Sequence, residues 1–336
     1  MTEGGPLTHS NKMILTTTLI VGNHGAVPRP LPVTLTAVAV LVAMALTGCA
    51  NPPVRAASGG RLSVVASFYP LQWVAEQVGG ERVEVTTMTK PGAEPHDLEL
   101  VPRDVARVVS AQVVIYLSGF QPSVDAAVGD ARGSAVFDAR PVADLDLTST
   151  PVEGGRFAER EAGSADPHFW LDPLRLARVA TAFADVLART DPRRGRGYRA
   201  AARRTVARLQ ALDVDYERGL ASCDQTDLVT SHDAFGYLAR RYHLRQVPIS
   251  GLSADAEPSP AELAAVSDFV DDRDVRTIYF ETLVSPAVAR TVAHEIGART
   301  AVLDPIEGLD DESQGSDYLA VMRSNLANLR RGQRCR

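Results

Sequence analysis

The sequence is poor in cysteine and has no excess of positive charge. It contains three Cys among 336 residues, and its 35 Lys and Arg are outnumbered by 41 Asp and Glu, which gives a formal net charge of −6. A nucleic-acid-binding domain usually carries a basic patch, whereas Arg and acidic residues are interspersed through this chain, so we expect no nucleic-acid partner. Hydrophobic residues make up 45% of the chain and charged residues 23%, which suits a globular protein of one or two domains.

The apolar run near the N-terminus is too short for a mature membrane-spanning helix. Residues 31–46 form an uncharged stretch of about 16 residues after Arg29, and a spanning helix needs about 20. The stretch is typical of the apolar core of an export signal, and it ends in Leu46-Thr47-Gly48-Cys49, which resembles the bacterial lipobox. We predict a lipoprotein-type signal peptide over residues 1–48 and a lipid anchor at Cys49 on the outer face of the cytoplasmic membrane. The alternative is a short membrane anchor that happens to contain Cys49.

Residues 49–61 are rich in Pro and Gly and are predicted to form a flexible tether. If Cys49 carries the lipid, Cys223 and Cys335 remain in an oxidising compartment, where a disulfide persists. We predict that these two residues pair; the alternative is two unrelated thiols.

From residue 62 onward, short apolar, β-branched runs alternate with helical patterns. The predicted strands are residues 62–66, 83–88, 113–117, 135–138, 228–230, 246–249, 277–280 and 300–303. Helix starts are marked by Asp172-Pro173, by the capping box Ser259-Pro-Ala-Glu262 and by Ser285-Pro286. This alternation indicates parallel α/β layers.

The strands fall into two groups, separated by residues 191–222, which are rich in Ala, Arg and Leu. A single helix of this length spans about 45 Å, which is too long for a simple crossover. The sequence therefore predicts an α/β protein with two parallel-sheet lobes, residues 62–190 and 223–336, joined by one long rigid helix over residues 191–222.

Three histidines lie where a strand or loop gives way to a helix, and an acid ends the last predicted strand. They are His96, His168, His232 and Asp304. A histidine near a helix start is more often a surface or capping residue. Here, however, two ligand-type residues come from each lobe, and ligands of open α/β sheets bind beyond the carboxyl ends of the strands. Because imidazole suits Zn²⁺ and one carboxylate completes a tetrahedron, these four residues predict a metal site in the cleft between the lobes.

The segments that carry these residues resemble a known family. They are PGAEPHDLEL (91–100), DPHFWLDP (166–173), SHDAFGYLARRY (231–242) and LDP (303–305). Together they are similar to the substrate-binding lipoproteins of zinc and manganese ABC importers, over nearly all of residues 62–336. The resemblance implies two lobes joined by one long helix, and a metal held between them by His96, His168, His232 and Asp304. It also implies a monomer without enzymatic activity that works with an ABC permease and its ATPase.

The choice of metal follows from the third ligand position. Manganese-type members have Glu there, whereas this sequence has His232, and three imidazoles favour Zn²⁺ over Mn²⁺. The same role for Mn²⁺ or another divalent ion is the alternative. Many zinc-type members carry a His-rich loop, but residues 144–166 hold Glu153, Glu159 and Glu161 and no His. We therefore expect no zinc-gathering by this loop.

Two further acids lie near the predicted ligands. Glu94 precedes His96 by two residues and Glu281 follows the predicted strand 277–280, so both are candidates to accept a hydrogen bond from a ligand histidine. For Glu94 the alternative is a solvated loop acid.

The predicted mechanism is capture without chemistry, with proton competition below the ordinary histidine pKa of about 6.5. The main alternative is a secreted zinc-dependent hydrolase, which would keep an open metal position for water and use Glu94 or Glu281 as a base. A binding protein for a chelated metal and an adhesin are further alternatives that the sequence leaves open.

Overall fold

The computed structural model describes residues 60–148, 164–252, 259–283, 286–295 and 297–336. These residues belong to one compact unit, Val54–Arg336. The predicted signal peptide, Cys49 and most of the tether lie outside the described residues, as do Glu153, Glu159 and Glu161. Among the helices that are described, none combines the length and apolarity needed to cross a bilayer.

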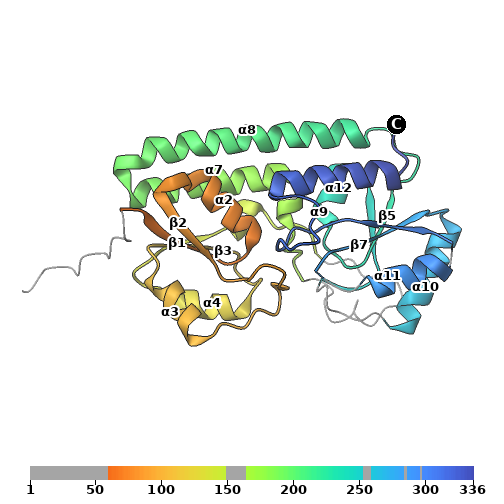
Figure 1. The fold of residues 1–336 in the computed structure, drawn as a ribbon, viewed down its shortest axis with the longest axis horizontal. Helices are drawn as coiled ribbons and strands as arrows, with labels where there is room; N and C mark the ends of the chain where they lie inside the picture. The colour runs from red at the N-terminus through yellow and green to blue at the C-terminus, as the bar shows by residue number, and fades with distance from the viewer. Residues whose placement is uncertain (1–59, 149–163, 253–258, 284–285, 296) are drawn as a thin grey trace, which may run out of the picture. The chain divides into compact units, whose positions relative to one another are not determined.

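The first sheet has four parallel strands in the order β2-β1-β3-β4. They are β1 (Leu62–Ala66), β2 (Val83–Thr87), β3 (Val113–Tyr116) and β4 (Ala135–Asp138). Val113, Val114 and Ile115 in β3 are fully buried, because helices cover both faces of the sheet. Figure 1 shows α3 and α4 on one face and α2 and α7 on the other. The helices of this part are α2 (Tyr69–Gly79), α3 (Pro102–Ser110), α4 (Pro122–Gly129) and α5 (Arg140–Ala143).

The second sheet repeats this arrangement in the order β6-β5-β7-β8, again with parallel strands. They are β5 (Asp227–Thr230), β6 (Arg245–Pro248), β7 (Thr277–Phe280) and β8 (Arg299–Val302). The helices among them are α9 (Gly236–Arg241), α10 (Pro260–Asp272) and α11 (Ala287–Glu295). All eight predicted strands are confirmed to within one residue at each end.

Three long helices connect and cover the two sheets: α7 (Pro173–Thr190), α8 (Gly195–Leu220) and α12 (Tyr318–Gly332). Figure 1 shows α8 running alongside α7 and α12. Its 26 residues span about 39 Å, less than the predicted helix over residues 191–222, because Pro192–Arg194 forms a separate 3₁₀ turn. The long joining helix itself is confirmed.

The helix starts follow the capping chemistry that the sequence indicates. The Asp172 side chain accepts a hydrogen bond of 2.9 Å from the backbone N–H of Leu174, at the start of α7. Ser259 and Glu262 form both hydrogen bonds of the capping box of α10. These bonds satisfy N–H groups that have no partner within the helix, so they define where each helix begins.

Cys223 and Cys335 form a disulfide. Cys223 follows the end of α8 and Cys335 follows the end of α12, so the bond joins the two helices where each ends. The two residues are 112 positions apart, and the closed loop contains the whole second sheet.

Replacing Cys335 by Ser should lower the free energy of unfolding by about 2–5 kcal/mol, because a covalent loop that restricts the unfolded chain is lost. Denaturant unfolding followed by circular dichroism measures this change. Cys223→Ser should lose a similar amount, and the double variant should lose no more than either single variant. A double variant that is less stable than both by several kcal/mol would contradict this account.

Candidate metal centre

The three histidines predicted as metal ligands lie in loops, two beside the first sheet and one beside the second. His96 lies between β2 and α3, and His168 lies just before the 3₁₀ turn Phe169–Leu171 that leads into α7. His232 follows β5, and its backbone carbonyl accepts a hydrogen bond from Thr230. His168 and His232 are fully buried, and the His96 side chain is 14% exposed.

All three imidazoles converge on one carboxylate oxygen, Oε1 of the fully buried Glu307. The Nε2 atoms of His96, His168 and His232 lie 3.3, 2.8 and 3.7 Å from it. Ligand bonds of 2.0–2.2 Å to Zn²⁺ place the atoms of a tetrahedral ligand set about 3.3 Å apart, so these separations suit four ligands around one ion. Glu307 also belongs to both groups of described residues whose ligand atoms all lie within 4.8 Å of one another.

Asp304, the predicted carboxylate ligand, lies outside both groups. It is buried directly after β8, where its Oδ1 accepts a hydrogen bond of 2.7 Å from the backbone N–H of Ile306. Asn325 of α12 holds the Asp304 backbone at both its N–H and its carbonyl group. In this arrangement Asp304 stabilises the turn that leads to Glu307.

The sequence reasoning missed Glu307 because it selected the acid that ends the last strand. The signal that points to Glu307 is a second acid three residues beyond Asp304, after a turn. Ile306 has a φ of 59°, a left-handed conformation that β-branched residues rarely adopt. Trp170, whose ring packs against His168, also donates a hydrogen bond of 2.7 Å to the Pro305 carbonyl and so helps to hold this turn.

Acidic side chains orient two of the imidazole rings. Asp166 Oδ1 lies 2.8 Å from His168 Nδ1, and Glu281 Oε1 lies 2.6 Å from His232 Nδ1. These contacts leave the Nε2 atom of each ring directed at Glu307. Glu281 therefore lies where an acceptor for a ligand histidine was predicted, whereas the contribution of Asp166 was not foreseen.

Glu94 holds the His96 loop through its backbone. Its Oε2 accepts hydrogen bonds from the N–H groups of His96 and Asp97, and its Oε1 lies 3.8 Å from His96 Nε2. Burial raises the pKa of Glu94, while the neighbouring His96 opposes this shift. The residue is mostly buried, unlike the solvated loop acid of the alternative.

Electrostatics favour a protonated, ion-paired centre when no ion is bound. Burial alone lowers the pKa of His168, but hydrogen bonds to Asp166 and Glu307 outweigh it and raise the pKa to about 9. Burial likewise opposes protonation of His232, yet Glu281 and Glu307 raise its pKa well above the ordinary value. Burial also disfavours the charged form of Glu307, but its contacts with His168, His232 and His96 hold its pKa well below the usual range.

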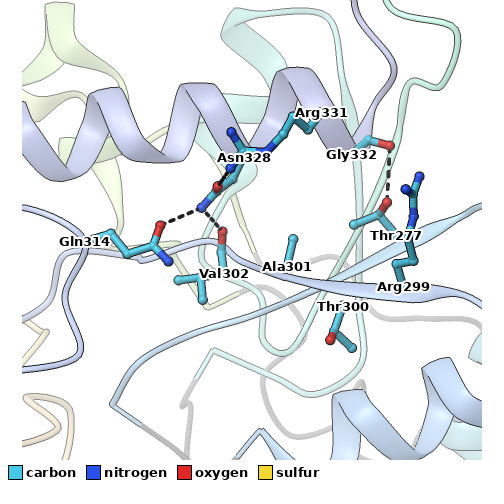
Figure 2. Close-up of a pocket in the computed structure, with 9 residues that line it drawn as sticks. All are labelled: Thr277, Arg299, Thr300, Ala301, Val302, Gln314, Asn328, Arg331 and Gly332. Carbon is cyan, nitrogen blue, oxygen red and sulfur yellow. Dashed lines mark hydrogen bonds between the residues drawn. The ribbon is translucent and has the colours of Figure 1, made fainter.

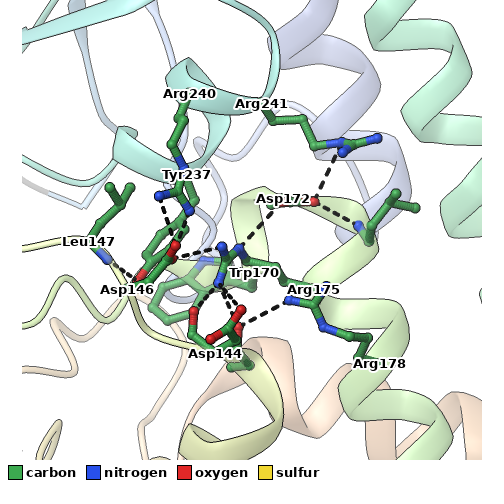
Figure 3. Close-up of polar contacts among 12 residues, drawn as sticks. Asp144, Asp146, Leu147, Trp170, Asp172, Arg175, Arg178, Tyr237, Arg240 and Arg241 are labelled. Carbon is green, nitrogen blue, oxygen red and sulfur yellow. Dashed lines mark hydrogen bonds and ion pairs between the residues drawn. The ribbon is translucent and has the colours of Figure 1, made fainter.

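A polar network links the segments that carry His168 and His232 (Figure 3). Asp146 accepts hydrogen bonds from Arg175 of α7 at 2.8 Å and from Arg240 of α9 at 2.7 and 3.0 Å. Both guanidinium groups also lie over the ring of Tyr237, whose hydroxyl donates to the backbone carbonyl of Asp166. Since α9 follows His232 and Asp166 precedes His168, this network ties the two ligand segments together.

A second set of ion pairs connects α9 to the long helix. Arg241 forms two hydrogen bonds with Asp213 of α8, at 2.6 and 2.8 Å, and lies 3.8 Å from Asp172 at the start of α7. Tyr242 donates to the same Asp213 carboxylate. These contacts fix α9 against both α7 and α8.

Known proteins with similar sequences include zinc-uptake components. The family described as "ZnuA: Zinc-uptake complex component A periplasmic" matches residues 64–332. The high-affinity zinc uptake system protein ZnuA of Bacillus subtilis is 33% identical over 298 residues, which cover 85% of this chain and 92% of that protein. The zinc-binding lipoprotein AdcA of Streptococcus pneumoniae is 35% identical over 299 residues, but the match covers only 59% of AdcA.

A solved structure supports the same relationship. The Zn(II)-bound ZnuA-like domain of Streptococcus pneumoniae AdcA is similar with a TM-score of 0.69 and 33% sequence identity, over 82% of this chain and 99% of that domain. With the family match over most of the described residues, these similarities show that the chain belongs to the ZnuA family of zinc-uptake components.

Proposed function

We infer that this chain is the extracytoplasmic zinc-binding component of an ABC importer, which captures Zn²⁺ and delivers it to the permease. The observation that carries this inference is the convergence of three imidazole Nε2 atoms on one buried carboxylate. Imidazole nitrogen is a good ligand for Zn²⁺. The similarity to proteins named for zinc uptake supports the same conclusion.

In this proposal His96, His168, His232 and Glu307 bind the ion, while Asp304 holds the turn that presents Glu307. Asp304 belongs to neither group of converging ligand atoms, and its Oδ1 is engaged by the backbone N–H of Ile306. Glu307, by contrast, lies within hydrogen-bond distance of the Nε2 atoms of His96 and His168 and belongs to both groups.

The donor set favours zinc capture over the two alternatives. Three nitrogen donors and one oxygen donor suit Zn²⁺ better than Mn²⁺, which prefers oxygen-rich sites. A zinc hydrolase keeps one coordination position open for water. Four protein ligands would fill a tetrahedral site, so capture without catalysis is the better supported function.

The membrane attachment and the partners are part of the same proposal. The lipobox-like sequence ending in Cys49, together with a relative named a lipoprotein, supports a lipid anchor on the outer face of the cytoplasmic membrane. The partners would be an ABC permease and its ATPase, and we expect the binding protein itself to be a monomer.

The carboxylate ligand can be identified by comparing two isosteric variants. Glu307→Gln should weaken zinc binding by more than about 100-fold, as His168→Ala should, because a ligand is lost. Asp304→Asn should weaken it by at most about 10-fold, because only the supporting turn is affected. Competition titration against a zinc chelator measures all three. Weaker zinc binding by Asp304→Asn than by Glu307→Gln would return the ligand role to Asp304.

Zinc binding should also release protons at pH 7.5. The pKa of His168 is raised to about 9 and that of His232 is also raised, so both rings are protonated at this pH in the metal-free protein. Zinc, however, binds only the neutral imidazole. We expect about two protons released per zinc bound. The apparent affinity for zinc should therefore keep rising as the pH increases beyond the ordinary histidine pKa of about 6.5. The sequence alone predicted proton competition only below that pKa.

Isothermal titration calorimetry in buffers with different ionisation enthalpies counts these protons. Glu281→Gln is the matched variant, because without the Glu281 charge the pKa of His232 falls and about one proton fewer should be released. The same heat of binding in every buffer at pH 7.5 would show that the histidines are already neutral.

A further inference from the structure

One segment of α8 departs from the mixed charge of the rest of the chain. Between Pro192 and Leu212 the sequence has no acidic residue, although the protein as a whole has a net charge of −6. The same interval contains seven exposed arginines: Arg193, Arg194, Arg196, Arg199, Arg203, Arg204 and Arg208. Arg196, Arg199 and Arg203 recur at spacings of three and four residues, which places them on one face of the helix.

Other arginines extend this positive surface beyond α8. A hollow of about 600 Å³ is lined by the first residues of the described chain, the end of α2 and the first turns of α8. Arg61, Arg82, Arg194 and Arg204 line it, with Glu81 as the acidic residue among its lining side chains. Figure 1 shows the beginning of α8 at the same end of the unit as the beginning of β1.

Few acids neutralise this charge. Arg61 pairs with Glu84, Arg194 with Asp191 and Arg199 with Asp185. Arg208 donates a hydrogen bond to Gln77 and has no acidic partner among the described residues. The other members also form no ion pair with any residue that the structure describes: Arg82, Arg193, Arg196, Arg203 and Arg204. We call these five residues the arginine surface.

The arginine surface lies beside the tether and away from the metal centre. Gly60 lines the hollow and stands 11 residues after Cys49 (60 − 49), so a fully extended tether reaches at most about 40 Å. Arg82 directly precedes β2, whereas His96 follows the other end of that strand. Arg82 therefore lies at the amino edge of the first sheet, and His96 lies beyond its carboxyl edge.

We propose that the arginine surface docks on the anionic phospholipids of the membrane that holds the anchor. Guanidinium groups form paired hydrogen bonds with phosphate, and each basic side chain near an anionic bilayer strengthens binding several-fold. A lipid anchor at Cys49 would hold the arginine surface within about 40 Å of the lipid headgroups. The permease must reach the ion at the opposite edge of the sheet, so it is a poorer match for this surface.

The inference rests on the proposed lipid anchor at Cys49, but it is tested without that anchor. The protein used is the unit Val54–Arg336. Solved structures of similar proteins align with this chain over 99% of their own length, so a protein of this extent folds without a lipid anchor. Its binding is measured by co-flotation with vesicles of phosphatidylcholine alone and of phosphatidylcholine mixed with phosphatidylglycerol. We expect binding only to the mixed vesicles, weakening as salt screens the charges.

The test variant is Arg196→Gln, Arg203→Gln and Arg204→Gln together. It should bind the mixed vesicles more weakly by a factor on the order of 100. The matched control removes three exposed arginines of the second lobe that form no ion pair with described residues: Arg299→Gln, Arg323→Gln and Arg330→Gln. Figure 2 shows Arg299 at another hollow, between β8 and α12. The control should bind vesicles like the native protein, and both variants should keep native zinc affinity.

Equal loss of vesicle binding in the variant and the control would overturn the proposal, because net charge alone would then explain it. Equal binding to both kinds of vesicle, or binding to soluble polyphosphate without binding to vesicles, would overturn it as well. Failure of the proposed function would appear elsewhere, as lost zinc binding by the native unit or as unmodified Cys49 in mass spectra of the membrane fraction.

Discussion

The buried carboxylate of Glu307, enclosed by three imidazole rings, is the constraint around which the rest of the structure is arranged. A desolvated carboxylate is costly unless positive charge or hydrogen-bond donors surround it. In the metal-free protein, protonated histidines meet this requirement, and the hydrogen bonds of Asp166 and Glu281 keep their rings in place. In the proposed function, a divalent cation would replace two of those protons and satisfy the same carboxylate, which would preserve the charge balance of the centre.

Such a centre depends on the relative position of two sheets, since His96 and His168 come from the first and His232 and Glu307 from the second. The ion pairs of α9 help to hold the two sheets in this relative position. Arg240 reaches Asp146 beside the first sheet, and Arg241 reaches Asp213 on the long helix. Together with the disulfide at the ends of α8 and α12, these contacts limit how far the two lobes move while the four side chains remain within reach of one ion.

The arginine surface and the zinc centre use electrostatics in opposite ways. In the centre, acids and histidines are buried and paired, so the charges act over short distances in a medium that screens them little. The arginines are exposed and mostly without acidic partners, so they act on large anionic surfaces and are sensitive to salt. Because Arg82 and His96 lie at opposite ends of β2, the proposed membrane contact and the proposed metal site use separate faces of the protein.

The sequence by itself determined the eight strands, the helix caps, the long joining helix and three of the four converging side chains. These features follow from local patterns of apolar residues, from capping chemistry and from the rule that ligands gather beyond strand ends. Only the tertiary structure shows that Glu307, and not Asp304, lies among the three imidazoles. Both acids follow the last strand, and the choice depends on a left-handed turn at Ile306, held by Asn325 and Trp170 from distant segments, which no local pattern records.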